Sequence, residues 1–362
     1  MATVEVSTWA ELVTAFDSIS TSEDTTIKLT ADIDMNDTNP EGTGLSKDSS
    51  WWQHTLIIDG GYTDSVTGED KNHVIKNLRT PISSTANLFY FTYNEQYGSS
   101  NQIYVKFKDI DFQNLILSSG NFVDWDSSKL QSFNLVIENC RFVGSRGNYY
   151  LIGKNLYTSG YATPSITCSK CYFDMPWNGA GQTNLSYTSL IPKDDSNNTN
   201  TVANYCRFKE SYGGCTWGDS LTYQSTDRFF SCSYFKMIGC RVEGSAQICG
   251  VTDLNDKGAY YMPIISKPNA SYVPTTQNVF DVEITAVRNS ATYDTDNVLY
   301  STFTGVVNKN VKYNGIDVTT FTDNRSDFDG GTTTAPILAT PAQMKDPSYL
   351  LSQGFDIIVP SE

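Results

Sequence analysis

A short pattern of alternating apolar and polar positions returns along the whole chain. In VIENCRFVG, residues 136–144, Cys140 and Phe142 alternate with polar neighbours, which is typical of a β-strand with one buried face. Similar phrases recur about every 29 to 42 residues. We call the first inward position of each copy its anchor, and the predicted anchors are Leu78, Ile110, Cys140, Cys171, Cys206, Cys240, Val282 and Val311.

This repeat predicts an all-β fold, a right-handed single-stranded parallel β-helix. One strand per repeat cannot bury its own apolar face, but strands stacked in successive coils form a continuous core. Each anchor is expected above the equivalent anchor of the coil below, so Cys140, Cys171, Cys206 and Cys240 form an internal ladder of free thiols. A β-sandwich or jelly roll also has many short strands, but it does not predict the same frame at every return.

Atypical segments at both ends predict caps over the open ends of the stack, as solenoids require. Thr8 to Glu11 form a capping-box pattern, and the apolar residues that follow predict an amphipathic helix. Near the other end, Thr340 precedes a predicted helical turn, and GFDIIV (354–359) predicts a final strand. The expected parts are an N-terminal cap helix with the first strand (1–36), the coils with their loop insertions (37–320) and a C-terminal cap (321–362).

The order of these segments resembles that of known β-helix proteins. IKLTADIDM (27–35), then IIDGGY (57–62) and HVIKNLR (73–79), is similar to the β-helix domains of bacterial adhesins with GLUG-like repeats and to the pectate-lyase-like appendage proteins of tailed bacteriophages. The ending QMKDPSYLLSQGFDI (343–357) is similar to closing segments of such proteins, especially those of Bacteroidetes and their phages. The resemblance spans most of the chain and implies the fold, but it carries over no catalytic residue.

Charge and composition argue against several kinds of partner. A net charge of −15 and a pI near 4.5 disfavour nucleic acid and anionic membranes. No run of about 18 apolar residues predicts a membrane span, and MATVEVSTWAELV does not have the layout of a secretion signal. With cysteines at anchor positions, this favours a virion protein assembled in a reducing host cytoplasm; the alternative is a secreted or cell-surface protein without its signal.

Candidate catalytic residues are few and weakly marked. Asp124 and Asp126 would lie on one face of an extended segment, and with Asp219 they are the candidate carboxylates of a glycosidase. Because 40 acidic residues make such pairs common by chance, we favour solvated turn aspartates. Cys168 and Cys171 have zinc-knuckle spacing, but two histidines and no second CxxC leave a zinc ligand set incomplete. We expect no metal and no cofactor, and we favour a non-enzymatic protein.

Five tryptophans are the first candidates for a binding surface. They lie among Gly, Ser, Asp and Asn, in loop contexts where an aromatic ring either packs locally or stacks on a sugar or a partner subunit. These residues are Trp51, Trp52, Trp125, Trp177 and Trp217.

A stripe of basic residues is the second candidate. Arg141, Arg207 and Arg241 each follow an anchor and point outward by strand alternation, and Arg79 and Lys312 share this position in the predicted frame. Such a stripe fits an acidic glycan or a partner subunit. The alternative is an ordinary solvated face whose arginines pair with nearby glutamates.

The favoured function is that of a non-enzymatic structural or attachment component of a phage virion: a head fibre, a capsid-decorating protein or a tail appendage. Its expected partners are other virion proteins and a host-surface polysaccharide, in a homotrimer or another symmetric assembly. One alternative is a tailspike-like polysaccharide depolymerase or lyase. Another is a secreted bacterial adhesin.

Overall fold

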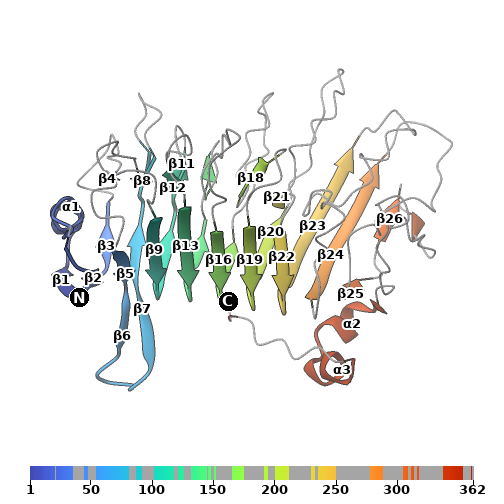
Figure 1. Cartoon of the computed structure of the whole chain (residues 1–362). Coiled ribbons are helices and arrows are strands. Elements are labelled where there is room, and N and C mark those ends of the chain that lie inside the picture. The colour runs from blue at the N-terminus through green and yellow to red at the C-terminus, as the bar shows by residue number, and fades with distance from the viewer. Residues whose placement is uncertain are drawn as a thin grey trace.

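The structure of the chain is a computed structural model, and Figure 1 shows it as an elongated stack of strands. Helix α1 (Trp9–Asp17) lies at the N-terminal end of the stack, and α2 (Pro341–Met344) and α3 (Pro347–Ser352) lie near its other end. The structure describes residues 1–20, 22–35, 45–47, 54–80, 87–91, 102–117, 121–125, 132–144, 146–147, 151, 165–174, 191–194, 200–211, 230–232, 235–249, 278–287, 305–308, 311–313, 316–317, 337–353 and 360.

Two long sheets form the faces of the stack. We call them sheet A and sheet B. Sheet A contains, in spatial order, β1 (Ala2–Val6), β2 (Thr25–Leu29), β5 (Thr55–Asp59), β9 (Gln102–Lys108), β13 (Ser132–Glu138), β16 (Ser165–Ser169), β19 (Asn200–Asn204) and β22 (Phe235–Ile238). Sheet B contains β3 (Ile33–Asp34), β7 (Asp70–Lys76), β10 (Ile110–Gln113), β14 (Arg141–Val143), β17 (Tyr172–Asp174), β20 (Arg207–Ser211), β23 (Arg241–Cys249), β24 (Asn278–Val287), β26 (Val311–Tyr313) and β27 (Ile316–Asp317).

Shorter strands complete the coils. One group pairs in the order β12 (Val123–Trp125), β8 (Phe89–Phe91), β4 (Leu45–Lys47). The other short pairs are β11 (Ile116–Leu117) with β15 (Arg146–Gly147), and β18 (Ile191–Asp194) with β21 (Phe230–Cys232). At the C-terminal end, β25 (Gly305–Asn308) pairs with β24 and with β28 (Ile337–Ala339).

The predicted parallel β-helix is confirmed by the strand pairing. Neighbouring strands of sheet B, such as β10 and β14 or β14 and β17, come from successive repeats and pair in parallel. Phe112, Phe142, Phe173 and Phe208 are directly in register. Their rings stack with centroid separations of 4.9, 5.3 and 5.1 Å. One apolar position per repeat therefore becomes a continuous aromatic column.

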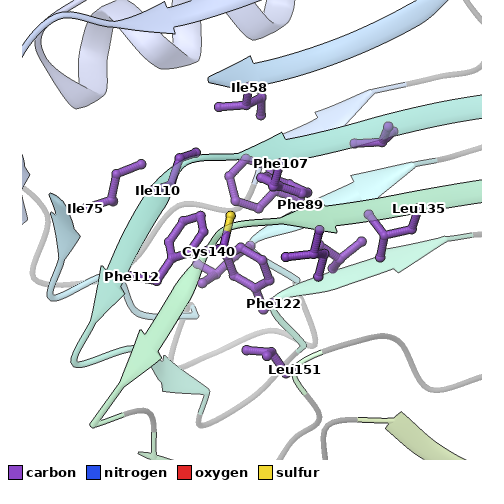
Figure 2. Packing of buried hydrophobic residues seen from close by; sticks show 14 of the residues in the cluster. Ile58, Ile75, Phe89, Phe107, Ile110, Phe112, Phe122, Leu135, Cys140 and Leu151 are labelled. Atoms are coloured by element: carbon purple, nitrogen blue, oxygen red, sulfur yellow. The ribbon is translucent and has the colours of Figure 1, made fainter. Parts of the chain in front are cut away.

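The cysteine anchors are buried in this core. Figure 2 shows Cys140 among Phe107, Phe112 and Phe122. Cys171 donates its thiol hydrogen to the carbonyl of Ile137, with a sulfur–oxygen distance of 3.2 Å, so the thiol links one coil to the coil before it. The buried cysteines at 140, 168, 171, 206 and 240 are all free thiols.

The chain turns sharply at each corner between sheet A and sheet B. Each corner is one residue in the left-handed region, with φ of 54° at Asp109, 50° at Asn139, 53° at Lys170, 52° at Tyr205 and 61° at Gly239. Asn and Gly tolerate this conformation better than other residues do. The Asn139 amide also donates to the Asp109 carboxylate at 2.7 Å, so adjacent corners are bonded to each other.

Three predicted anchors, Leu78, Val282 and Val311, do not lie at the strand position that the cysteine anchors occupy. Leu78 is buried, but His73 is the residue opposite Ile110. Asn77 (φ 62°) follows β7 and lies at the corner where the chain leaves sheet B, which we call the far corner; Asn114 is its equivalent after β10. Asn139 instead lies at the corner where the chain enters sheet B. Because both corners need a left-handed residue, NLR and NCR look alike in sequence while marking opposite ends of a strand.

The two late anchors are also displaced. Val282 lies opposite Gly244, and Val311 lies opposite Ile284, so neither continues the column of Cys240. Strands β23 and β24 pair over their whole length, beyond the end of the shorter strands of earlier coils. In these long strands, apolar and polar residues keep alternating beyond the position that corresponds to Cys240. The sequence pattern therefore selected Val282 and Val311, which lie farther along the strand than a true anchor does.

The N-terminal cap is the predicted helix. Thr8 caps α1 by accepting from the Glu11 backbone N–H at 3.2 Å, and Glu11 accepts from the Ser7 backbone N–H at 2.7 Å. The buried Phe16 packs against Phe89, with ring centroids 6.1 Å apart. The helix therefore closes the open end of the core.

The C-terminal cap consists of two short helices. Thr340 and Gln343 form a capping box at the start of α2, and Asp346 caps α3. The described strand of this region, β28, precedes the helices, and the predicted final strand at 354–359 lies outside the described residues. The boundaries 1–36, 37–320 and 321–362 stay a prediction.

Candidate interaction surface

The outer face of sheet B carries the row of side chains in which the arginine stripe was predicted. Asp111, Arg141, Tyr172, Arg207 and Arg241 lie opposite one another on five successive strands. The stripe is thus interrupted by an aromatic ring between its first and second arginines. The same alternation that buries Phe142 and Phe173 directs this row away from the core.

Tyr172 is clamped by its two arginine neighbours. The guanidinium carbon of Arg141 lies 4.9 Å from the centroid of the ring, and that of Arg207 lies 5.6 Å from it. The tyrosine hydroxyl donates to the Asp174 carboxylate at 3.4 Å. The ring is buried although it belongs to the outer row, because the guanidinium groups of Arg141 and Arg207 lie over it.

The C-terminal half of the row is occupied by the chain itself. Arg207 and Arg241 both bind Glu243, the former with an Nε–Oε2 distance of 2.7 Å. Nη1 of Arg241 also donates to the Met344 carbonyl at 2.9 Å, and Nη1 of Arg207 to the Pro360 carbonyl at 3.4 Å. The side chains of Arg241 and Arg207 are only 13% and 16% exposed.

Glu243 is the charged centre of this cluster. Burial raises the pKa of the carboxyl, but hydrogen bonds from Arg241 and Arg207 and their positive charge outweigh burial, so the pKa lies below its ordinary value. The carboxylate is therefore ionised at neutral pH. This agrees with the alternative interpretation of the stripe, in which arginines pair with glutamates, for Arg207 and Arg241.

The N-terminal half of the row adjoins a hairpin that leaves the coil between β5 and β7. Strand β6 (Gly61–Thr63) pairs antiparallel with the first residues of β7, and Figure 1 shows the hairpin projecting from the edge of the stack. A Cβ at Gly60 would lie 2.6 Å from the Asp109 carbonyl oxygen, so no side chain fits where the hairpin leaves the coil.

The tip of the hairpin is preformed by Asp64. Its carboxylate accepts from the backbone N–H groups of Val66 and Thr67 at 2.8 and 3.0 Å, and from Lys71 Nζ at 2.6 Å. These bonds, first among them the one from Lys71, hold the pKa of Asp64 well below its ordinary value. Val66 is fully presented to solvent at the turn.

The root of the hairpin meets the row at Asp111. Asn72 donates through Nδ2 to the Asp111 carboxylate and to the Asn139 carbonyl, both at 3.0 Å, and Nε of Arg141 lies 3.5 Å from Asp111 Oδ2. Burial raises the pKa of Asp111, and the contacts from Asn72 and Arg141 offset part of this effect.

An aromatic pair stands beside these polar groups. The Tyr62 ring stacks on the His73 ring, with centroids 4.3 Å apart, and His73 Nδ1 lies 3.1 Å from the Asp32 carboxylate. Tyr62 is 38% exposed, which makes it one of the most exposed aromatic side chains among the described residues. We call the group Tyr62, Asn72, His73, Asp111 and Arg141 the hairpin–sheet surface.

Of the five tryptophan candidates, only Trp125 lies among the described residues. Trp125 is buried and stacks on Phe133 with centroids 4.6 Å apart, so its prediction as a binding residue is wrong. It lies in β12, where alternation directs both Val123 and Trp125 inward. The other four, Trp51, Trp52, Trp177 and Trp217, lie outside the described residues.

Of the three carboxylate candidates, only Asp124 lies among the described residues. Asp124 lies in β12, where it accepts from Asn121 Nδ2 at 2.9 Å and from the Trp125 backbone N–H at 2.8 Å. Asp126 and Asp219 lie outside the described residues.

No metal site and no membrane helix occur in the part of the chain that the structure describes. Within it, no group of three or more His, Cys, Asp or Glu side chains could hold a metal ion. Cys168 and Cys171, the candidate zinc pair, are both buried thiols. None of the described helices is long and apolar enough to cross a bilayer.

Sequence reasoning missed most of the hairpin–sheet surface. Tyr172 and Asp111 could have been found, because each follows an anchor in the same frame as the arginines. Asn72 and His73 gave no such signal, since the hairpin shifts β7 relative to the repeat. Arg79 pairs with Ile116 at the far corner and therefore lies outside the stripe, and Lys312 lies opposite Thr285.

Comparison with known proteins adds one finding. A family model described as "Putative pectate lyase-like adhesive domain" matches residues 3–146. No curated protein matches the chain. The matched part contains the N-terminal cap, the hairpin and the coils up to β15, and it includes the whole hairpin–sheet surface. Over this part, the chain is similar to pectate lyase-like adhesive domains.

Proposed function

We propose that this protein is a non-enzymatic attachment protein that adheres through the outer face of sheet B. The observation that carries the proposal is the similarity of residues 3–146 to an adhesive domain, because those residues hold the hairpin–sheet surface. The stacked coils form a stiff support on which such a surface keeps its geometry.

The ligand that best fits this surface is a polysaccharide. Tyr62 offers a partly exposed ring, and Asp111, Asn72 and Arg141 place an acceptor, an amide and a cation on neighbouring strands. Sugars are bound by an aromatic face together with such polar groups. The net charge of −15 favours a glycan that is not strongly acidic.

We assign the protein to a phage virion, as a head fibre, capsid decoration or tail appendage, with a host-surface glycan and neighbouring virion proteins as partners. Buried free thiols support assembly in a reducing cytoplasm. A trimer or another symmetric assembly is the expected oligomeric state. Mass spectrometry of purified particles, with cross-linking, tests this assignment: a fixed copy number linked to capsid or tail subunits supports it, and absence from the particles contradicts it.

Adhesion itself is tested by binding of the full chain to a glycan array and to whole host cells. Tyr62→Ala should weaken binding by about tenfold or more, because a partly buried aromatic contact is a frequent anchor of recognition. Tyr104→Ala is the matched control, since Tyr104 is 37% exposed but lies on sheet A. Equal binding by wild type and Tyr62→Ala would contradict the assignment of this surface.

A second candidate function is polysaccharide cleavage, and Asp111 favours it. Burial raises the pKa of this carboxyl, as a general acid requires, and Arg141 lies beside it. Incubation of host polysaccharide with wild type and with Asp111→Asn tests this function. Release of new reducing ends or unsaturated sugars by wild type alone would establish cleavage; no release by either leaves adhesion as the function of the surface.

A further inference from the structure

We propose that the Arg207–Glu243–Arg241 cluster is a latch that fastens the C-terminal cap to the outer face of sheet B, and that the latch opens before the coils unfold. The two arginines are held by one carboxylate and each reaches a main-chain carbonyl. The partners are distant in sequence: 103 residues separate Arg241 from Met344, and 153 separate Arg207 from Pro360.

Each guanidinium binds both Glu243 and a main-chain carbonyl of the C-terminal segment. Nε of Arg207 donates to one carboxylate oxygen of Glu243, and Nε of Arg241 donates to the other. This leaves Nη1 of each arginine directed at a carbonyl of the C-terminal segment. Glu243 is therefore a positioning residue, because it fixes both guanidinium planes without touching the cap itself.

The cap binds through main-chain atoms at these two points. A carbonyl is present in every residue, so the arginines recognise where the segment runs and not which side chains it carries. The outer row of sheet B thus has two functional halves. Arg141, whose side chain is 29% exposed, borders the hairpin–sheet surface, while Arg207 and Arg241 serve the cap.

In the described part of the cap, apolar burial is limited to a few side chains. In α2, Met344 is fully buried, and in α3 Leu350 is buried, whereas Leu351 is 61% exposed. Helices of this length are not stable alone. A segment with little buried apolar area opens locally at a lower free energy than the core, so loss of the arginine contacts should release the cap and leave the coils folded.

Hydrogen–deuterium exchange of the full chain tests the latch. The probes are amides inside the cap, such as Met344 N–H, bonded to the Thr340 carbonyl, and Leu350 N–H, bonded to the Asp346 carbonyl. Glu243→Gln and Arg241→Gln should each raise their exchange rates by about tenfold or more, the effect of losing a charge-assisted hydrogen bond. Lys76→Gln, which removes an ion pair with Asp34 between β7 and β3, is the matched control and should leave these rates unchanged.

The core strands distinguish a latch from general destabilisation. Amides of β9 and β13 should keep their wild-type exchange rates in Glu243→Gln and Arg241→Gln. Equal acceleration in cap and core would overturn the latch, and so would unchanged rates in the cap. If Arg241→Gln fails to fold, Arg241→Lys serves instead: lysine keeps the charge but lacks the fork of nitrogens that reaches Glu243 and the Met344 carbonyl together, so exchange should accelerate in the cap and not in β9.

Discussion

The corners of the coil place strong demands on single residues. Each A–B corner is one residue in the left-handed region, where most side chains are strained. The demand is met in different ways, by Asn139, whose amide bonds the neighbouring corner, and by Gly239, which has no Cβ. At Gly239 the space is also filled, because an added Cβ would lie 2.7 Å from the ring of Tyr205.

Substitution at this corner should therefore be costly. Gly239→Ala is expected to lower the free energy of unfolding by about 2 kcal/mol or more, from backbone strain and the clash with Tyr205 together. Gly68→Ala is the control: φ there is 71°, but nothing lies within 4 Å, so only the backbone term of about 1 kcal/mol applies. Urea unfolding measures both variants, and equal losses would show that the Tyr205 contact contributes nothing.

Single thiols also carry a testable property. Burial raises the pKa of Cys140, Cys168 and Cys206 well above its ordinary value, so these thiols stay protonated and inaccessible in the native state. Iodoacetamide at pH 8 should modify them only after denaturation. Peptide mapping by mass spectrometry measures this, and rapid native labelling at these three positions would contradict their burial.

At the scale of elements, stacked strands share one aromatic column. Phe173 lies between Phe142 and Phe208, with rings nearly parallel on both sides. Strands β14 and β17, which carry Phe142 and Phe173, are three residues long, so their stability depends on the coils above and below them. The column is thus a point at which the loss of one side chain affects three coils.

Removal of the central ring should produce a large effect. Phe173→Ala is expected to cost about 3 to 5 kcal/mol, the range for deleting a buried aromatic side chain and leaving a cavity. Thermal unfolding followed by circular dichroism measures the loss. Phe173→Leu, which retains most of the volume, should lose much less; comparable losses in the two variants would argue against a cavity as the cause.

At the scale of the whole molecule, the ends of the chain differ in how they are closed. The N-terminal helix covers the core through buried apolar side chains. The C-terminal segment also accepts hydrogen bonds from Arg241 and Arg207, on the outer face of sheet B, through the Met344 and Pro360 carbonyls. Both ends contain a carboxyl whose pKa lies below its ordinary value: Glu11, through hydrogen bonds from Ser7, and Glu243. Because α1 also packs its buried apolar side chains on the core, acid should release the C-terminal cap before the N-terminal one.

The direction of that pH dependence follows from Glu243. Its pKa is lowered in the folded state, so its stabilising contribution is fully present above the unfolded pKa near 4.5 and is lost as the pH falls through the lower folded pKa. Exchange in α2 and α3 should accelerate as the pH falls below about 4.5, after correction for intrinsic rates. If lowering the pH accelerates exchange in the wild-type cap no more than in the cap of Glu243→Gln, Glu243 is not the titrating group.

Much of the fold could be predicted from the sequence, and little of the interaction surface. The aromatic positions at 112, 142, 173 and 208 share one frame, which is visible in the letters because alternation and stacking are periodic. Leu78 shows the limit: a left-handed Asn precedes it, but at the other corner of the strand. Trp125 shows another, because its polar neighbours indicated a loop while the backbone forms a strand.

The sequence by itself determined the parallel β-helix, the N-terminal helix and the buried cysteine ladder. These follow from periodic burial and from local capping, which depend on residues close in the chain or one repeat apart. Only the tertiary structure decided that Tyr172 divides the arginine stripe into two halves with different partners. Asn72 and Asp111, or Arg241 and Met344, come together through the path of the hairpin and the return of the C-terminal segment, and no repeat encodes such distant contacts.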